Sequence, residues 1–404
     1  MSQNLVSTPP WTDNKRYVWQ LGMAVPALAA VGLWSIWQFQ SAAGMWALFV
    51  FFYGVIPLMD WLLGEDKENP PESLVPDLEN DRYYSWILYA FAPIQYAVFV
   101  GGCYLAGTMD LAWHDMLGLM IGVGIVGGFG INTGHELGHK KAKFDRWLAR
   151  VCLAQTGYGH FYVEHNRGHH KNVSTPLDPA TSRMGEWFWT FLPRSVLGGI
   201  RSAWQLEAER LARQGRSVWS VHNENLQSWA MTAVLFGAMV AWMGPKVLPF
   251  LVVQAVYGFS LLEVVNYLEH YGLLRRQVAA GRYERCLPEH SWNSNHIVTN
   301  VFLYHLQRHS DHHAHPARKY QALRHFEEAP QLPSGYAAMV LLAYVPPLWF
   351  KVMDKRLIQH YRGDFSRIHV YEPRRQALLR QYGDYAKQVQ QSSAEQAGVS
   401  ARAA

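Results

Sequence analysis

Six long stretches of apolar residues constrain this chain of 404 residues more than any other feature of its sequence. A helix of about 20 apolar residues crosses the hydrocarbon core of a bilayer, where lipid offers the backbone no hydrogen-bond partner. Each stretch is therefore predicted to be a membrane-spanning helix. The six predicted spans are residues 17–39, 45–64, 83–107, 111–133, 226–243 and 247–268.

Very short connections join these spans in pairs. Residues 40–44, 108–110 and 244–246 leave room only for tight hairpins, so all three lie on one side of the membrane. That side carries almost no Lys or Arg, whereas the basic stretch 140–150 lies on the other. The positive-inside rule then predicts that both termini are cytoplasmic. The triplet 27–29 (Ala-Leu-Ala) lies inside the first apolar run and not after it, which argues against a cleaved signal peptide.

The polar remainder of the chain, mostly residues 134–224 and 268–404, is predicted to form a cytosolic helical cap. Prolines interrupt the apolar stretch 336–350, so we expect it to lie on the membrane surface or to pack beneath the bundle. Residues 391–404 are small and polar, which predicts a disordered tail or the start of a linker. The predicted fold is an all-α membrane protein, a six-transmembrane-helix bundle with a single membrane-embedded domain over residues 1–390.

Nineteen histidines are many for this length, and most of them crowd into a few short stretches. His135 and His139, at the end of the fourth span, lie four residues apart, so one metal ion can reach both from a single helix face. In the second stretch, a regular α-helix would place His165 and His169 on one face and turn His170 about 100° away, toward a second metal ion.

The third stretch, with His309, His312 and His313, follows the same geometric logic. His270 emerges from the sixth span level with the end of the fourth span. These nine imidazoles have no thiolate among them and suit iron, copper or zinc, and two metal ions with four to five ligands each would use all nine. The cap is therefore predicted to carry a histidine-rich dinuclear metal site.

Two simpler metal sites fit the sequence less well. The pattern H-E-x-x-H at His135 suggests a zinc protease with Glu136 as its base, but the other histidines supply far more ligands than one open zinc site uses. The three cysteines lie far apart without a C-x-x-C pair, which excludes a disulfide framework, a zinc knuckle and an iron–sulfur site.

Acidic residues near the histidines are candidates to orient them, because a ligand histidine usually donates its other N–H to a carboxylate or carbonyl. The five candidates are Glu136, Glu164, Asp178, Glu269 and Asp311. Asp60 and Glu263 lie within predicted spans, where acids are costly, and are either functional or helix-packing acids. No catalytic residue beyond the metal ligands is predicted.

Six spans with the boxes H-x-x-x-H, H-x-x-x-H-H and H-x-x-H-H resemble the membrane histidine-box di-iron proteins, which include acyl desaturases and sterol hydroxylases. Within that group the chain resembles the bacterial alkane 1-monooxygenases (AlkB) from about residue 10 to about residue 370. The resemblance rests chiefly on residues 132–140, 164–170, 266–274 and 306–316.

The resemblance implies a non-haem di-iron site, with two Fe ions bound by His135, His139, His165, His169, His170, His270, His309, His312 and His313. It implies O2-dependent terminal hydroxylation of medium-chain n-alkanes to 1-alkanols at the bacterial inner membrane. Because the sequence has no flavin, nicotinamide or iron–sulfur motif, a partner must deliver the electrons; the resemblance implies that this partner is rubredoxin, which rubredoxin reductase reduces. The linker-like tail adds the hypothesis of a rubredoxin fused at the C-terminus, and no nucleic acid partner is expected.

Alkanes dissolve in the bilayer, so an apolar channel between helices is expected, with Phe51, Phe52, Tyr53 and Tyr257 as candidate lining residues. Three alternatives remain open. A desaturase, or an acyl or xylene-type hydroxylase, would share the metal chemistry. A metal transporter would place its ligands at the bilayer midplane. A zinc-stabilised scaffold would bind metal without any reaction.

Overall fold

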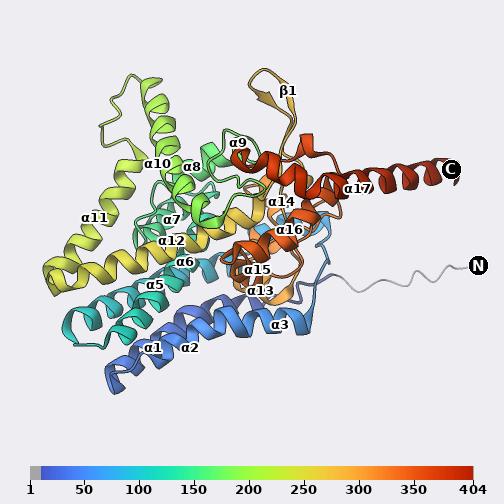
Figure 1. Ribbon diagram of the computed structural model, residues 1–404. Helices are drawn as coiled ribbons and strands as arrows, with labels where there is room; N and C mark the ends of the chain where they lie inside the picture. Colours follow the sequence, from blue (N-terminus) through green and yellow to red (C-terminus); the bar gives the residue numbers. More distant parts are fainter. Residues whose placement is uncertain (1–10, 404) are drawn as a thin grey trace, which may run out of the picture.

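The structure, a computed structural model, describes residues 11–403, with side chains described to residue 396. Within that range, six helices are long and apolar enough to cross a membrane, and they pack side by side into a bundle (Figure 1). Three spans are single helices: α5 (Arg82–Thr108), α6 (Trp113–Gly138) and α11 (Glu224–Met243). The first span, Val18–Phe39, is a 3-10 turn (Val18–Met23) followed by α1 (Ala24–Phe39), and the sixth, Pro245–His270, is a 3-10 turn (Pro245–Val247) followed by α12 (Leu248–His270). The second span, Ala43–Leu63, consists of α2 (Ala43–Val50), a π-helical turn (Phe51–Val55) and α3 (Ile56–Leu63). All six predicted spans are confirmed, and each predicted end lies within five residues of the observed one.

Helix α6 is the most buried of the six spans and contacts α1, α2, α5 and α12. Its glycines allow this close packing. A Cβ atom at Gly124 would lie 2.9 Å from the carbonyl oxygen of Gln254 on α12, and one at Gly130 would overlap the side chain of Gln95 on α5. Small residues let helices approach closely in lipid, where no hydrophobic effect drives them together.

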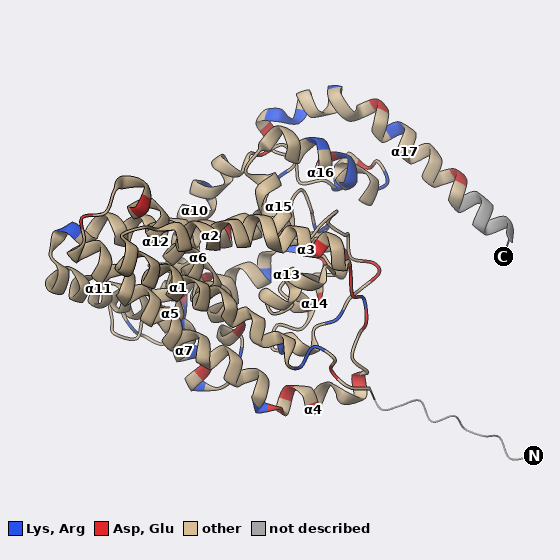
Figure 2. Ribbon diagram, turned by 90° about the horizontal axis from the view of Figure 1, so that it is seen from below, with Lys and Arg blue, Asp and Glu red and all other residues tan. Residues whose placement is uncertain are grey.

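The rest of the described chain forms a cap at one end of the bundle, where charged residues gather, whereas the spans carry few charges (Figure 2). Its longer helices are α7 (Lys143–Ala154), α10 (Phe188–Ala212), α15 (Tyr336–Ala343), α16 (Pro346–His360) and α17 (Arg375–Ala403). Its shorter elements are α4 (Val75–Asn80), α8 (Phe161–Glu164), a π-helical turn (His165–His169), α9 (His170–Asn172), α13 (Ile297–Phe302), α14 (His309–Ala314), the antiparallel strands β1 (Gln277–Ala279) and β2 (Arg282–Tyr283), and five 3-10 turns (Glu72–Leu74, Pro288–His290, Tyr320–Ala322, Phe365–Arg367, Glu372–Arg374).

Helices α15 and α16 form a sharply bent pair at an angle of 119°. Gly335, just before α15, lies against the inner end of the second span, where a Cβ would overlap the carboxylate of Asp60. Asp60 in turn accepts a hydrogen bond of 3.0 Å from the backbone N–H of Thr299 on α13. Asp60 therefore joins the second span to the cap, and α15 packs beneath the bundle, one of the two positions expected for this stretch.

The last helix differs from the expectation for the tail. Composition predicts a disordered tail or a linker from residue 391, but the structure continues α17 to Ala403. Alanine, glutamine and glutamate are good helix formers, so a segment with little to bury still continues the helix. The domain boundary at residue 390 stays a prediction, and Ala404 lies outside the described residues.

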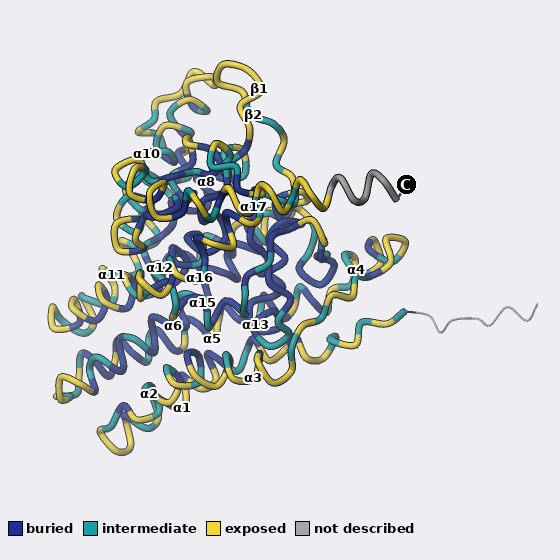
Figure 3. Tube along the Cα trace, turned by 45° about the vertical axis from the view of Figure 1, so that its right-hand side comes forward, coloured by how far each residue is buried: buried dark blue, intermediate teal, exposed yellow. Residues whose placement is uncertain are grey.

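The most deeply buried part of the chain lies where the bundle meets the cap (Figure 3). The cap-side ends of α6 and α12 enter this region from the bundle, and α14 and α15 enter it from the cap. The arrangement brings the histidine-bearing segments together away from solvent.

Candidate metal centre

Five histidines from four segments converge in one group, hereafter the five-histidine group. Its members are His135, His139, His165, His170 and His312, and one nitrogen from each lies within 4.8 Å of all the others. The Nε2 atoms of His135 and His312 are 2.9 Å apart, and those of His139 and His165 are 3.1 Å apart. The end of α6 and the start of α14 thus meet at this group, as the spacing of His135 and His139 predicts.

The other four histidines form a second group, hereafter the four-histidine group. Its members are His169, His270, His309 and His313, and all four are buried. The Nε2 atoms of His309 and His313 lie 2.9 Å apart, because residues four apart on the α-helix α14 share a face. His312 points from the same helix into the five-histidine group. The structure therefore brings together all nine predicted histidines.

The second histidine stretch departs from the prediction. Residues His165–His169 form a π-helical turn, in which the hydrogen bond runs from residue i to i+5 and the turn is wider than an α-helical turn. His165 and His170 consequently share a face, with Nε2 atoms 3.1 Å apart, and His169 belongs to the four-histidine group. The prediction that His165 pairs with His169 is wrong, since it assumed regular α-helical geometry.

The spacing of the nitrogens fits metal ions. Two nitrogens bound at a right angle to one ion, each at about 2.1 Å, lie about 3.0 Å apart, close to the 2.9–3.1 Å found here. In the four-histidine group, the buried Nε2 atoms of His169 and His270 have no hydrogen-bond partner among the described residues. Buried polar atoms rarely remain unpaired, so both groups are suited to hold metal.

The protonation of the rings also fits metal binding. Burial holds the pKa well below the ordinary value for six histidines outside the spans, and their neighbouring imidazoles lower it further. The six are His139, His165, His170, His309, His312 and His313. Their rings are therefore neutral near pH 7, and a neutral imidazole presents the lone pair that a metal ion requires.

Two of the five candidate acids contact the grouped histidines. The Asp178 carboxylate lies 3.0 Å from Nδ1 of His169, and Glu269 lies 3.1 Å from Nδ1 of His309. Burial alone would lower the pKa of His169, but the Asp178 carboxylate raises it above the ordinary value. Both acids are placed to fix the ring orientation, so that each Nε2 faces the four-histidine group.

The other three candidate acids contact different partners. Glu136 pairs with Lys140 at 2.7 Å, and Asp311 lies 2.8 Å from both His315 and Arg318. Glu164 accepts a hydrogen bond of 3.4 Å from Ser202. Nearness in sequence to a grouped histidine therefore does not distinguish the acids that contact a histidine ring of the two groups from the acids that bind other residues.

Glu263 and Glu164 line a small polar cavity beside His165 and His169. Tyr158 donates a hydrogen bond of 2.6 Å to Oε1 of Glu263, whose Oε2 has no partner among the described residues. Burial, and secondarily Asp178, raises the pKa of Glu164 to about 8. Glu263 thus lies near the site, whereas Asp60 has the structural role described above.

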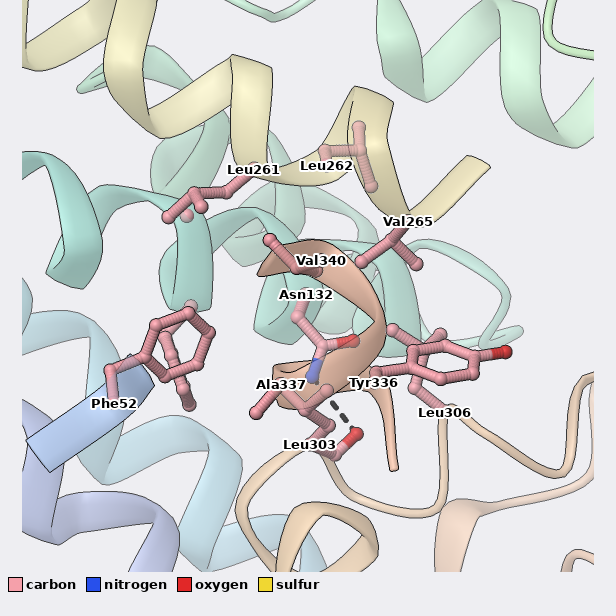
Figure 4. Close-up of a pocket in the computed structure, with 12 residues that line it drawn as sticks. Phe52, Asn132, Leu261, Leu262, Val265, Leu303, Leu306, Tyr336, Ala337 and Val340 are labelled. Carbon is pink, nitrogen blue, oxygen red and sulfur yellow. Dashed lines mark hydrogen bonds between the residues drawn. The ribbon is translucent and has the colours of Figure 1, made fainter. Parts of the chain in front are cut away.

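An apolar cavity is lined by residues of the second, fourth and sixth spans together with residues of the cap (Figure 4). Its lining residues are Phe52, Gly128, Phe129, Asn132, Leu261, Leu262, Val265, Leu303, Leu306, Tyr336, Ala337 and Val340. Asn132 precedes His135 by three residues on α6, so this wall of the cavity lies about one helical turn from the five-histidine group. Leu306 precedes His309 of the four-histidine group by three residues, in the non-helical segment before α14.

Only Phe52 among the four predicted channel residues lines this cavity. Tyr53 and Tyr257 instead hydrogen-bond to each other through their hydroxyls at 2.9 Å, and Phe51 packs against Phe302. Sequence reasoning missed the contribution of α15. The small and apolar residues at 337 and 340, three apart on one helix face, are the signal that could have indicated it.

Comparisons with known proteins agree with this geometry. Residues 111–343 match the fatty acid desaturase family. The chain is 46% identical over 391 residues to alkane 1-monooxygenase 1 of Alcanivorax borkumensis, covering 95% of this chain and 97% of the relative. It is 47% identical to an alkane 1-monooxygenase of Pseudomonas putida, covering 94% and 95%. It is also 29% identical to the xylene/toluene monooxygenase hydroxylase component XylM of Pseudomonas putida, covering 55% and 58%. The chain, a multi-pass membrane protein whose residues 111–343 match the fatty acid desaturase family, therefore belongs to the alkane 1-monooxygenase family.

Proposed function

We propose that the chain is an alkane 1-monooxygenase that hydroxylates the terminal carbon of medium-chain n-alkanes with O2 and releases 1-alkanols. The observation that carries this proposal is the apolar cavity that ends beside the histidine groups. The curated relatives with this activity in their names cover almost the whole chain.

The nine grouped histidines would hold two iron ions, one in the five-histidine group and one in the four-histidine group. The nitrogen spacing, the neutral rings and the absence of thiolates among these residues support a non-haem iron site. Bound iron would supply the oxygen chemistry needed to break an unactivated C–H bond, which side-chain acids and bases cannot do. Asp178 and Glu269 would hold two of the ligand rings in orientation.

The cavity suits a hydrocarbon that has no polar group. Of its two polar lining side chains, Asn132 donates its amide hydrogen to the carbonyl of Leu303 at 3.0 Å. The other, Tyr336, directs its hydroxyl to the carbonyl of Trp292 at 3.4 Å. Both polar groups thus already have a backbone partner, and the remaining lining residues are apolar or glycine, so the lining favours an alkane over a fatty acyl substrate.

The walls would also position the chain for terminal attack. Phe52 and Leu261 come from membrane spans, and Leu306 comes from the cap, three residues before His309. Phe52 and Leu306 lie on opposite sides of the cavity (Figure 4). A linear alkane that enters from the lipid would present its terminal methyl first. The narrow lining would exclude water and hold that methyl next to the metal site, which is the positioning that sets regioselectivity.

Electrons would come from rubredoxin, reduced by rubredoxin reductase, because each turnover needs two electrons and the sequence has no motif for an organic redox cofactor. Lys141, Lys143 and Arg146 are exposed on the cap and would attract a small acidic protein. Arg308 is not part of this surface, because it is buried and donates a hydrogen bond to the carbonyl of Leu323. A rubredoxin fused beyond residue 404 remains a hypothesis.

The membrane would be the bacterial inner membrane, with both termini in the cytoplasm. Trp11 donates a hydrogen bond of 2.9 Å to Glu68 on the cap side, and α17 lies at the same end of the molecule (Figure 1). The exposed lysines and arginines of the cap support this orientation. The histidine groups would then face the cytoplasm, where reduced rubredoxin is available.

The test is product analysis by gas chromatography and mass spectrometry. Membranes with the iron-loaded chain, rubredoxin, its reductase and NADH receive a series of n-alkanes and, separately, fatty acyl substrates. We expect 1-alkanols from the wild type and from His114→Ala, whose exposed ring lies at the far end of α6, but none from His312→Ala. Desaturated acyl products without alkanols would replace the proposal with a desaturase.

A further inference from the structure

A groove of about 430 Å3 lies on the cap between α16 and α17. Trp187, Pro346 and Phe350 form its apolar part, and Lys351, Lys355 and Arg374 bring three cations to it. None of these residues belongs to the histidine groups or to the apolar cavity.

The three cations of the groove lack anionic partners. Within the described side chains, none of them lies within ion-pair distance of a carboxylate. The Arg374 guanidinium lies 5.1 Å from the ring of Phe350, and the Lys355 ammonium lies 5.3 Å from that of Tyr385. Elsewhere on the cap, cations such as Arg194 and Arg210 are paired with buried acids, so this groove has an excess of positive charge.

One acid, Asp354, lies at the floor of the groove. It is buried, and its Oδ1 accepts a hydrogen bond of 2.7 Å from the hydroxyl of Tyr271. Burial raises its pKa to about 7, so the carboxyl is only partly ionised at neutral pH and cannot balance three cations.

The groove adjoins an apolar tip. At the bend between α15 and α16, Val345 and Leu348 are 45% and 51% exposed, and nearby Trp187 and Trp189 are 51% and 53% exposed. Trp189 stacks on Tyr344, which fixes the start of α10 against this bend. Exposed tryptophans beside aliphatic residues are typical of the boundary between lipid tails and headgroups, which places the adjoining cations at the level of lipid phosphates.

We propose that this groove binds the headgroup of an anionic phospholipid. Lys351, Lys355 and Arg374 contact the phosphate, and the acyl chains lie along Trp187 and Leu348. A cationic groove beside an apolar, membrane-facing tip matches a phospholipid, which carries its phosphate next to its acyl chains. Because α16 continues from α15, and α15 forms one wall of the apolar cavity, the bound lipid also stabilises that wall.

The test measures lipid binding to the purified full-length, metal-loaded protein in detergent. Native mass spectrometry and thermal unfolding are recorded with added phosphatidylglycerol, with phosphatidylcholine, and with inorganic phosphate alone. The variant combines Lys351→Gln, Lys355→Gln and Arg374→Gln. The matched control removes the same charge from the β1–β2 hairpin region with Arg276→Gln, Arg282→Gln and Arg285→Gln.

We expect phosphatidylglycerol, but neither phosphatidylcholine nor phosphate, to remain bound and to raise the unfolding temperature. Apparent affinity should fall about tenfold or more in the groove variant, because charge-assisted contacts to the phosphate are lost, and should be unchanged in the control. Equal binding of the two lipids, an equal loss in the control, or undiminished binding by a folded groove variant would overturn the proposal. Equal protection by inorganic phosphate would overturn the assignment to lipid.

Discussion

The Nε2 atoms of His165 and His170 lie 3.1 Å apart although the two residues are five positions apart in the sequence. On a regular α-helix, residues five apart face directions about 140° apart. The π-helical turn His165–His169 brings them onto one face and leaves His169 for the other group. His169 and His170, which are adjacent in the sequence, thereby belong to two different histidine groups.

The division into two groups predicts metal contents for paired substitutions. His169→Ala with His313→Ala removes two members of the four-histidine group and should leave about one iron per chain. His169→Ala with His170→Ala removes one member from each group and should lower the binding of both ions. Iron per folded chain, measured by inductively coupled plasma mass spectrometry, checks this. Identical iron contents in the two variants would show that the groups do not bind independently.

Removing the charge of Asp178 should weaken the four-histidine group. Asp178→Asn keeps the size of the side chain but loses the carboxylate that lies 3.0 Å from His169. Loss of such an orienting acid typically costs about 10- to 100-fold in metal affinity, which competition with a chelator measures. Glu327→Gln is the control, because the exposed Glu327 contacts His325, which belongs to neither group. Unchanged affinity in Asp178→Asn would contradict the orienting role.

Filling the apolar cavity should shorten the range of substrates. Ala337→Leu adds bulk to the cavity lining, so product from the longest accepted n-alkanes should fall about tenfold or more, because the cost of a few misfitting methylenes is of that size. Shorter alkanes should still react. Ala338→Leu is the matched control on the same helix, at a position outside the lining. The measurement is the yield of 1-alkanol as a function of alkane chain length. Equal yields for the two variants at every chain length would show that the substrate does not bind in this cavity.

Charge reversal on the exposed basic surface should weaken the use of rubredoxin. Lys141→Glu with Arg146→Glu should raise the KM for rubredoxin about tenfold at low ionic strength, since charges at the rim of an interface mainly govern encounter. The effect should shrink as salt screens the charges. Arg213→Glu with Arg216→Glu, between α10 and α11, is the control. A rubredoxin-driven rate that is unaffected in the first variant would remove this docking site.

The pH dependence of stability should carry the signature of Asp354. Burial raises the pKa of this carboxyl to about 7, so the folded state favours the protonated form. The folded state therefore loses stability as pH rises from about 4, the ordinary pKa of an aspartate, to about 7. Asp354→Asn should remove that loss and add about 4 kcal/mol above pH 7, because each pKa unit corresponds to about 1.4 kcal/mol. Thermal unfolding of both proteins across pH measures it, and a constant difference would contradict the assignment.

The spans and the set of nine histidines could be predicted because each depends on local rules. A span is defined by the length of an apolar run, and a histidine pair by its spacing along a helix. The pairing of His165 with His170 could not be predicted, because the spacing of the histidines does not distinguish a π-helical turn from an α-helical turn. The same limit applies to the acids: Asp178 and Asp311 are equally plausible in sequence, and only tertiary packing brings Asp178 to a grouped histidine.

The cavity shows a further limit of sequence reasoning. Phe52 could be predicted from the second span, but Leu303, Leu306 and α15 approach it from parts of the cap that are distant in sequence. The tail shows the opposite case. Its composition indicates little burial, yet the structure continues α17 to Ala403.

Two pairs of consecutive residues, His169–His170 and His312–His313, each send one ring to either group. Two short backbone segments therefore each link the five-histidine group to the four-histidine group over a fixed length. The two histidine groups therefore cannot move apart unless both of these backbone segments change conformation, and metal ions bound in the groups would be held at a restricted separation. A substitution that makes only one of these two backbone segments more flexible should broaden the distribution of metal–metal distances in the metal-loaded protein without removing metal from either group.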